Sequence, residues 1–299
     1  MDKLKIALDW TPNINHIGFY VAKYKGFYKD LGIDLEIIDT SIDNYEVTPA
    51  KKVEQGIVDF ALCPLESIIS YRRKKKPFPL IAIAAILQDD LSAIAVKTGS
   101  DIMSPKDLDG KTYSSYQARY EDGIVKEMIK NAGGSGELNI IYPEKLGIWE
   151  NLISGKSDAT WIFLNWEGIE AEQKHYNLRY FKLSDHAIPY SYSPVLAANE
   201  LNLESHHDAY RHFLEATKQG YLYSQEHQKE AVDILSKHIL SDDKHIDLKK
   251  ALAFTAPHFG NKFMWGKMVP KRVTAFLNWL EEKDLEQNKL DFTDVARIL

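Results

Sequence analysis

Short apolar runs that alternate with helical runs are the feature that most limits the folds open to this chain. The first run has apolar residues at every second position, Leu4, Ile6 and Leu8, as in a strand with one buried face. Helical spacing follows from Ile17 to Gly26, where a glycine is the usual residue after a helix end. Because the alternation of strand and helix continues along the chain, the pattern predicts an α/β fold with largely parallel sheets.

The same reading places the other elements. Further strands are expected at 33–38, 58–62, 80–87, 92–97, 111–113, 138–142, 159–164 and, as the last one, 195–198. Helices are expected at 49–56, from 64 onward, at 124–129 and at 149–153, and the chain beyond the last strand is helical.

Two lobes are expected, because 299 residues are too many for one small core. A new α/β series begins near Ser104. We therefore expect lobe one at 1–90 plus 193–299 and lobe two at 95–190. The hinges would lie near 88–92 and 190–194, with the ligand cleft between the lobes.

Composition excludes several classes of function. The net charge of −6 gives no electrostatic basis for binding nucleic acid. A single cysteine, Cys63, excludes an internal disulfide and a multi-cysteine metal site, and no catalytic or phosphate-loop motif is present. We expect no metal, no cofactor and no transmembrane segment. The location is expected to be cytoplasmic if Met1 is the native start, and periplasmic or that of a lipoprotein if a leader has been removed.

Aromatic and polar side chains gather at the predicted strand ends and hinges, where open α/β sheets bind their ligands. The candidate residues are Trp10, Asn13 and His16 in the first loop; Trp166 and Glu167 after strand 159–164; Tyr190 and Tyr192 at the second hinge; and Gln88 at the first. The alternative for the first loop is that Trp10 fills the core and His16 caps the helix.

The chemistry of these candidates suits a flat aminated heterocycle. Aromatic rings can sandwich a planar ligand. The carboxylate of Glu167 can accept hydrogen bonds from an exocyclic amine and a protonated ring nitrogen together. The alternative for Glu167 is that it complements the dipole of a helix as a first-turn acid. Glu66 is also a first-turn acid, and for it the dipole role is favoured over a ligand role.

Several phrases resemble one known family: LDWTPNINHIGFYVAKYKGFYKDLGID, VEQGIVDFAL, SPKDLDGK, ISGKSDATWIFLNWEGIEA and MWGKMVP. They look like the thiamine-pyrimidine-precursor binding proteins, a family that includes formylaminopyrimidine receptors of ABC importers and the fungal-type hydroxymethylpyrimidine phosphate synthase. The resemblance implies a two-lobed type II periplasmic-binding-protein fold with a hinge and an interlobe cleft. It also implies a substrate-binding protein for a thiamine pyrimidine precursor, with an ABC transporter permease as a partner.

The chain departs from the synthase where the resemblance places the aldehyde-binding lysine and the sacrificial histidine, because Cys63 and Ser67 stand there. Without an amine no Schiff base forms, so we expect no synthase activity. Two alternatives remain at this stage. One is a cytoplasmic enzyme of pyrimidine or thiamine precursor biosynthesis on the same fold, and the other is a cytoplasmic ligand carrier or sensor.

A second departure replaces the family's glycine-rich loop, which meets the polar end of the ligand. This chain has Ser114 and Ser115 there, followed by Arg119. A serine pair ahead of a helix can present hydroxyl and N–H groups to an anion, and Arg119 can add a bidentate contact. The alternative is that Arg119 pairs with Glu121 or Asp122 on the surface.

Overall fold

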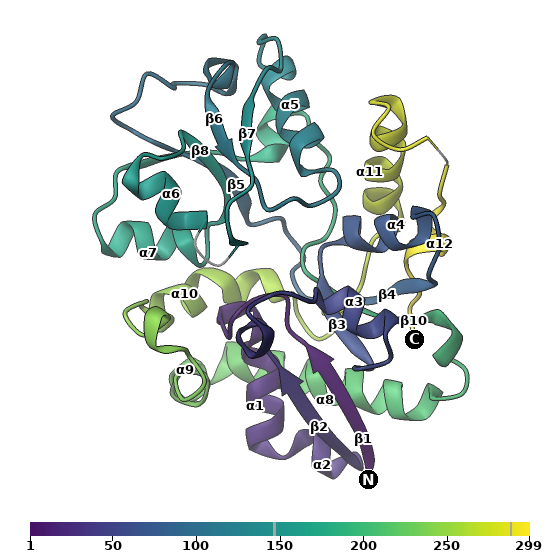
Figure 1. Cartoon of the computed structure of the whole chain (residues 1–299). Coiled ribbons are helices and arrows are strands. Elements are labelled where there is room, and N and C mark those ends of the chain that lie inside the picture. Colours follow the sequence, from purple (N-terminus) through teal and green to yellow (C-terminus); the bar gives the residue numbers. More distant parts are fainter. Residues whose placement is uncertain (146–147, 288) are drawn as a thin grey trace. The chain divides into compact units, whose positions relative to one another are not determined.

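The computed structural model describes residues 1–145, 148–287 and 289–299. The chain divides into two compact units, each with its own sheet (Figure 1). Unit 1 comprises Met1–Asp89, Tyr192–Val269 and Asp291–Leu299, and unit 2 comprises Asp90–Ser191 and Pro270–Leu290.

The sheet of unit 1 has five strands in the order β2-β1-β3-β10-β4. They are β1 (Asp2–Ala7), β2 (Ile33–Ile38), β3 (Phe60–Cys63), β4 (Leu80–Ala85) and β10 (Val195–Asn199). The strands β2, β1 and β3 are parallel, whereas β10 runs antiparallel to both β3 and β4. The carboxyl ends of the three parallel strands therefore lie at one edge of the sheet.

Eight helices belong to unit 1: α1 (Ile17–Lys25), α2 (Phe27–Asp30), α3 (Pro49–Glu54), α4 (Leu65–Arg73), α8 (His207–Glu226), α9 (Gln228–Leu235), α10 (Leu248–Thr255) and α12 (Phe292–Val295). The long helix α8 packs directly on α1. Their backbones approach at two glycines, because a Cβ added to Gly220 would lie 2.0 Å from the carbonyl oxygen of Gly18.

Unit 2 has a second five-stranded sheet, in the order β7-β6-β8-β5-β9. Its strands are β5 (Ser92–Lys97), β6 (Thr112–Ser114), β7 (Asn139–Ile141), β8 (Ala159–Phe163) and β9 (Leu178–Phe181). Its helices are α5 (Glu121–Asn131), α6 (Ile148–Ser154), α7 (Glu167–Gln173) and α11 (Pro270–Glu282). Here β7, β6 and β8 are parallel, and β5 is antiparallel to β8 and β9.

Several features differ from the sequence-based expectation. Each sheet is mixed, with two parallel and two antiparallel strand pairings, and is not largely parallel. The strand β9 is absent from the predicted set, because its four residues show no alternation and it forms only through pairing with β5 at the sheet edge. Residues 270–290 were expected in lobe one but cluster with unit 2. There the ring of Phe276 packs on Tyr190, and Lys283 forms an ion pair with Glu127.

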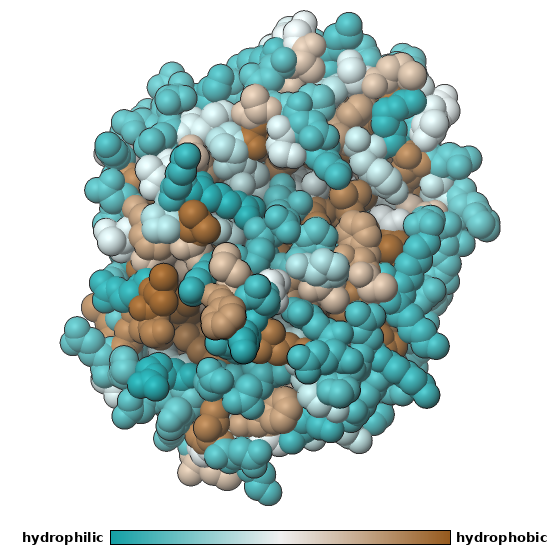
Figure 2. Space-filling view, turned by 180° about the vertical axis from the view of Figure 1, so that it is seen from behind, coloured by the Kyte–Doolittle hydropathy of each residue, from teal (hydrophilic) through white to brown (hydrophobic). Residues whose placement is uncertain are grey.

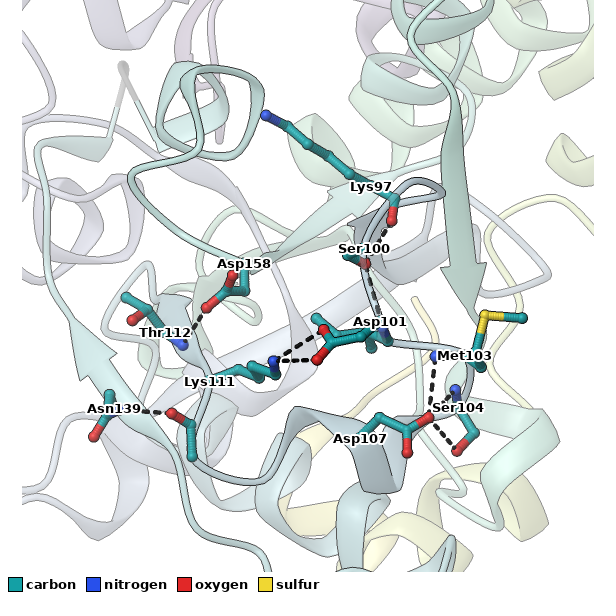
Figure 3. A network of polar contacts seen from close by, with 12 residues as sticks. Lys97, Ser100, Asp101, Met103, Ser104, Asp107, Lys111, Thr112, Asn139 and Asp158 are labelled. Carbon is teal, nitrogen blue, oxygen red and sulfur yellow. Dashed lines mark hydrogen bonds and ion pairs between the residues drawn. The ribbon is translucent and has the colours of Figure 1, made fainter.

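The phrase SPKDLDGK builds a polar network at the amino end of β6 (Figure 3). Lys111 forms an ion pair with Asp101, and the Asp107 carboxylate accepts hydrogen bonds from the backbone N–H groups of Met103 and Ser104. The carboxylate of Asp158 accepts from the N–H of Thr112, the first residue of β6. These contacts fix the start of β6, at the edge of the sheet opposite to its carboxyl end.

Most large apolar side chains are buried within the two units, and the face drawn in Figure 2 is mainly hydrophilic with a few apolar patches. Across the residues that the structure describes, no helix is long and apolar enough to cross a bilayer.

The close approach of α1 and α8 gives a test of packing. Gly220→Ala is expected to lower the melting temperature, because its methyl group would push against Gly18 and overpacking of this kind costs about 1–3 kcal/mol. The matched control is Gly168→Ala in α7, where the nearest atom is 3.6 Å away, so alanine fits and gains up to about 1 kcal/mol of helix propensity. Scanning calorimetry that finds the Gly220 variant as stable as the parent would contradict this packing.

Candidate functional site

The loop after β1 is held by a closed set of hydrogen bonds around His16. Asn13 caps the short 3-10 helix Ile14–His16, where its side-chain oxygen accepts from the N–H of Asn15 at 2.9 Å. The N–H of Asn13 donates to Nδ1 of His16 at 3.1 Å, and Nε2 of His16 lies 2.7 Å from Oδ1 of Asp9. Because Nδ1 accepts, Nε2 carries the proton and donates to Asp9. Both ring nitrogens of His16 therefore have internal partners.

Asp9 is part of a group of acidic and ionisable side chains at the carboxyl edge of the unit 1 sheet. Burial raises the pKa of the Cys63 thiol, and the neighbouring Asp9 and Glu66 carboxylates raise it further. Burial also raises the pKa of Tyr45, with Asp9 and then Cys63 adding to the effect. Asp9 and Tyr45 lie in the segments that follow β1 and β2, Cys63 is the last residue of β3, and Glu66 lies in the first turn of α4. The three parallel strands therefore bring the four residues together.

Trp10 adds an aromatic face to this group. Its ring centroid lies 5.7 Å from that of Tyr45, with 57° between the ring planes, and both side chains are half-buried. Sequence reasoning missed Asp9 and Tyr45 as site residues. The available signal was their position, since both follow strands whose carboxyl ends share one edge.

Two other candidates in unit 1 contact the segment before Val269. The side-chain amide of Gln88 donates to the carbonyl oxygen of Lys267 at 3.3 Å. The hydroxyl of Tyr192 accepts from the N–H of Val269 at 2.9 Å, and its carbonyl oxygen accepts from the N–H of Leu65 at 3.0 Å. Tyr192 thereby fixes the start of α4, next to Glu66.

In unit 2 the loop after β6 wraps around one buried carboxylate. Glu121 accepts from the hydroxyl of Tyr113 at 2.7 Å and from the N–H groups of Tyr116 and Ala118 at 3.1 and 3.3 Å. The hydroxyl of Ser115 accepts from the N–H of Gln117 at 3.1 Å. Two backbone N–H groups of this loop thus bind the protein's own acid, while anion binding by Ser114 and Ser115 stays a prediction.

Arg119 pairs with neither of the two acids considered as its surface partners. Its guanidinium donates to Oε2 of Glu286 at 2.8 Å, and the hydroxyl of Tyr120 donates to the same oxygen at 2.7 Å. The alternative of a surface pair with Glu121 or Asp122 is wrong because the acidic partner comes from the segment after α11, which is distant in sequence.

The remaining candidates surround the end of β8. Trp166 is buried directly before α7, and Oε2 of Glu167 accepts from the N–H of Phe163 at 2.9 Å. The ring of Tyr190 packs against those of Trp161 and Phe276, whose centroids lie 5.3 and 5.4 Å from its own. Glu167 therefore ties the helix start to the strand end, and its role toward a ligand stays a prediction.

Within each unit, the structure groups several predicted site residues at one sheet edge. Unit 1 gathers Trp10, Asn13, His16 and Glu66 beside Asp9 and Tyr45, while unit 2 carries Ser114, Ser115, Trp166 and Glu167 at the carboxyl ends of β6 and β8. Gln88, Arg119, Tyr190 and Tyr192 are engaged in the contacts above, and their part in ligand binding stays a prediction.

Comparison with known proteins gives relatives of two kinds. The chain is 25% identical over 236 residues to the formylaminopyrimidine-binding protein of Halalkalibacterium halodurans, covering 79% of this chain and 70% of that protein. It is also 25% identical over 241 residues to the 4-amino-5-hydroxymethyl-2-methylpyrimidine phosphate synthase of Candida albicans, covering 77% and 69%. One named relative is therefore a binding protein and the other an enzyme.

Solved structures show the fold. The ligand-binding component of an ABC-type import system from Staphylococcus aureus aligns with a TM-score of 0.72 at 15% identity, covering 100% of this chain and 97% of that one. A Candida albicans protein described as having the generic periplasmic-binding-protein fold aligns with a TM-score of 0.73 at 14% identity, covering 99% and 96%. The chain has this fold, as the α/β pattern and the resemblance predicted. The family model described as NMT1/THI5 like matches residues 13–231, so the chain belongs to the NMT1/THI5-like family.

Proposed function

We propose that this chain is a substrate-binding protein for a small heterocyclic metabolite, a thiamine pyrimidine precursor, and that it serves an ABC-type importer. The observation that carries the proposal is the combination of an aromatic face, the partly exposed Asp9 and the buried Glu66 at the carboxyl edge of the unit 1 sheet. The relatives named above support it, because one of them is named for binding formylaminopyrimidine and a structural neighbour for ABC-type import.

The chemistry of this edge suits an aminopyrimidine. A flat ring can lie against Trp10 or Tyr45, while amino and protonated ring-nitrogen donors meet a carboxylate such as Asp9. The bond from His16 fixes the Asp9 carboxylate before a ligand arrives, which reduces the ordering cost of binding.

The side chain of Cys63 supports binding over catalysis at this edge. Its thiol is buried and its pKa is raised, so it is protonated at neutral pH and a poor nucleophile. A thiol also cannot form the Schiff base for which the synthase uses its lysine. Incubation with pyridoxal phosphate is expected to give no absorbance band of an internal aldimine, and such a band would favour the enzyme.

Ligand binding is expected to raise the melting temperature, because a ligand present at a hundred times its Kd stabilises the folded state by about 2.7 kcal/mol. We expect this shift with formylaminopyrimidine or 4-amino-5-hydroxymethyl-2-methylpyrimidine.

Trp10→Ala should weaken binding of both pyrimidines by about 0.5–1.5 kcal/mol through loss of stacking. Tyr24→Ala, an exposed aromatic on α1, is the control and should change neither. The proposal fails if no thiamine precursor in such a panel shifts the parent protein.

Glu167→Gln tests the specificity role predicted for this acid. The glutamine oxygen can keep the hydrogen bond from Phe163, so the fold is expected to persist. Binding of an aminopyrimidine should weaken by about 1.5–3 kcal/mol, the range for hydrogen bonds to charged groups. The control is Glu172→Gln on the same helix, and both are measured by isothermal titration calorimetry. Unchanged affinity in the Glu167 variant would leave this acid with only its local role at the start of α7.

A further inference from the structure

The junction between β6 and α5 in unit 2 has the form of an anion site. A strand, a short loop and a helix start follow one another, an arrangement whose N–H groups commonly bind phosphate or carboxylate. Gln117 in this loop has φ of +62°, the left-handed conformation that turns successive N–H groups inward. The junction therefore has the backbone shape needed to hold a negative charge.

The position for that charge is already taken by Glu121. Its Oε1 accepts from Tyr113 and from the N–H of Tyr116, and its Oε2 accepts from the N–H of Ala118. The side chain is 3% exposed, so this is a buried internal anion and not a surface contact. Burial raises the pKa of Glu121, while its three hydrogen bonds oppose that shift by favouring the charged form.

The acids around Glu121 also oppose the binding of a second anion at this junction. Asp122 places a second carboxylate in the same first turn of α5. The guanidinium of Arg119 is paired with Glu286, so it does not offset these acids at the junction. Burial lowers the pKa of Lys145 and the Glu121 carboxylate opposes that shift, so this cation already faces Glu121. A phosphate entering here would meet occupied donors and like charge.

The hydroxyl of Ser114, at the end of β6, is not among the groups that donate to Glu121. The hydroxyl of Ser114 is fully buried and has no hydrogen-bond partner among residues 1–145, 148–287 and 289–299. A hydroxyl can donate or accept, so it suits an uncharged hydrogen-bonding group such as an alcohol.

We propose that Glu121 takes the place of a ligand anion, so that this chain binds an unphosphorylated pyrimidine and rejects its phosphate ester. The proposal rests on the function proposed above and names the ligand class for the same protein. Glu121 acts here as a specificity-determining residue, through the loop donors that it occupies.

The first test compares 4-amino-5-hydroxymethyl-2-methylpyrimidine with its phosphate ester by isothermal titration calorimetry. The parent protein should bind the alcohol at least about tenfold more tightly, because the phosphate ester would meet the like charge of the Glu121 carboxylate. Glu121→Gln should reduce the ratio of the affinity for the alcohol to that for the ester. Asp122→Asn, which removes the same charge one residue away, should leave most of this preference for the alcohol. Equal or tighter binding of the ester by the parent overturns the proposal, and that comparison needs no variant to fold.

A second measurement does not depend on the pyrimidine. The amide NMR signals of Tyr116 and Ala118 are followed while inorganic phosphate is added. They should stay in place in the parent and shift with saturation in Glu121→Gln. A saturable shift in the parent would show that the loop is open to anions and would overturn the proposal. If the parent binds neither pyrimidine, the proposed function fails, while this titration still decides the role of Glu121.

Discussion

Parallel pairing of β2, β1 and β3 is the constraint on which the candidate site depends. Parallel strands need crossover connections, and these return every carboxyl end to one edge of the sheet. The Asp9 carboxylate therefore raises the pKa of Tyr45 and of Cys63, although both residues are distant from it in sequence. Unit 2 repeats the pattern with β7, β6 and β8, whose carboxyl ends carry Ser114 and the segment that leads to Glu167. In each unit the position of the candidate site residues follows from the strand order.

Both edges contain acids whose burial must be compensated, and the two units do this differently. A buried carboxylate without partners is costly, so the chain around it folds to supply donors. Asp9 receives a ring N–H from His16, which is itself oriented by the backbone N–H of Asn13. Glu121 receives two backbone N–H groups and a tyrosine hydroxyl. Asp9 is still partly exposed, with 20% of its side chain accessible, whereas Glu121 is enclosed. Of the two, Asp9 is the acid that is open to a new partner.

Local patterns in the sequence predicted most of the fold, and non-local contacts account for the rest. Period-two and helical spacing placed nearly all strands, and the first loop follows β1 as expected. The pairing of Arg119 with Glu286, the packing of residues 270–290 on unit 2 and the edge strand β9 all depend on contacts between distant segments. Tyr45 was missed for a similar reason. It lies in a loop with positive φ, where no periodic pattern indicates which way a side chain points.

Membership of this family does not by itself separate binding from catalysis, because one fold hosts both functions and the chemistry lies in particular side chains. Two positions in this chain bear on the distinction. At the end of β3 the protonated thiol of Cys63 provides neither an amine nor an activated nucleophile. At the end of β6 the loop donors are committed to Glu121, so they are not available to a phosphate-bearing reactant. The protonated Cys63 thiol lowers the reactivity of its edge, and the commitment of the loop donors to Glu121 lowers the affinity for anions at the other. The acids and aromatic rings stay in place. Such an arrangement is consistent with the proposed function, in which the protein holds an aminated ring without converting it.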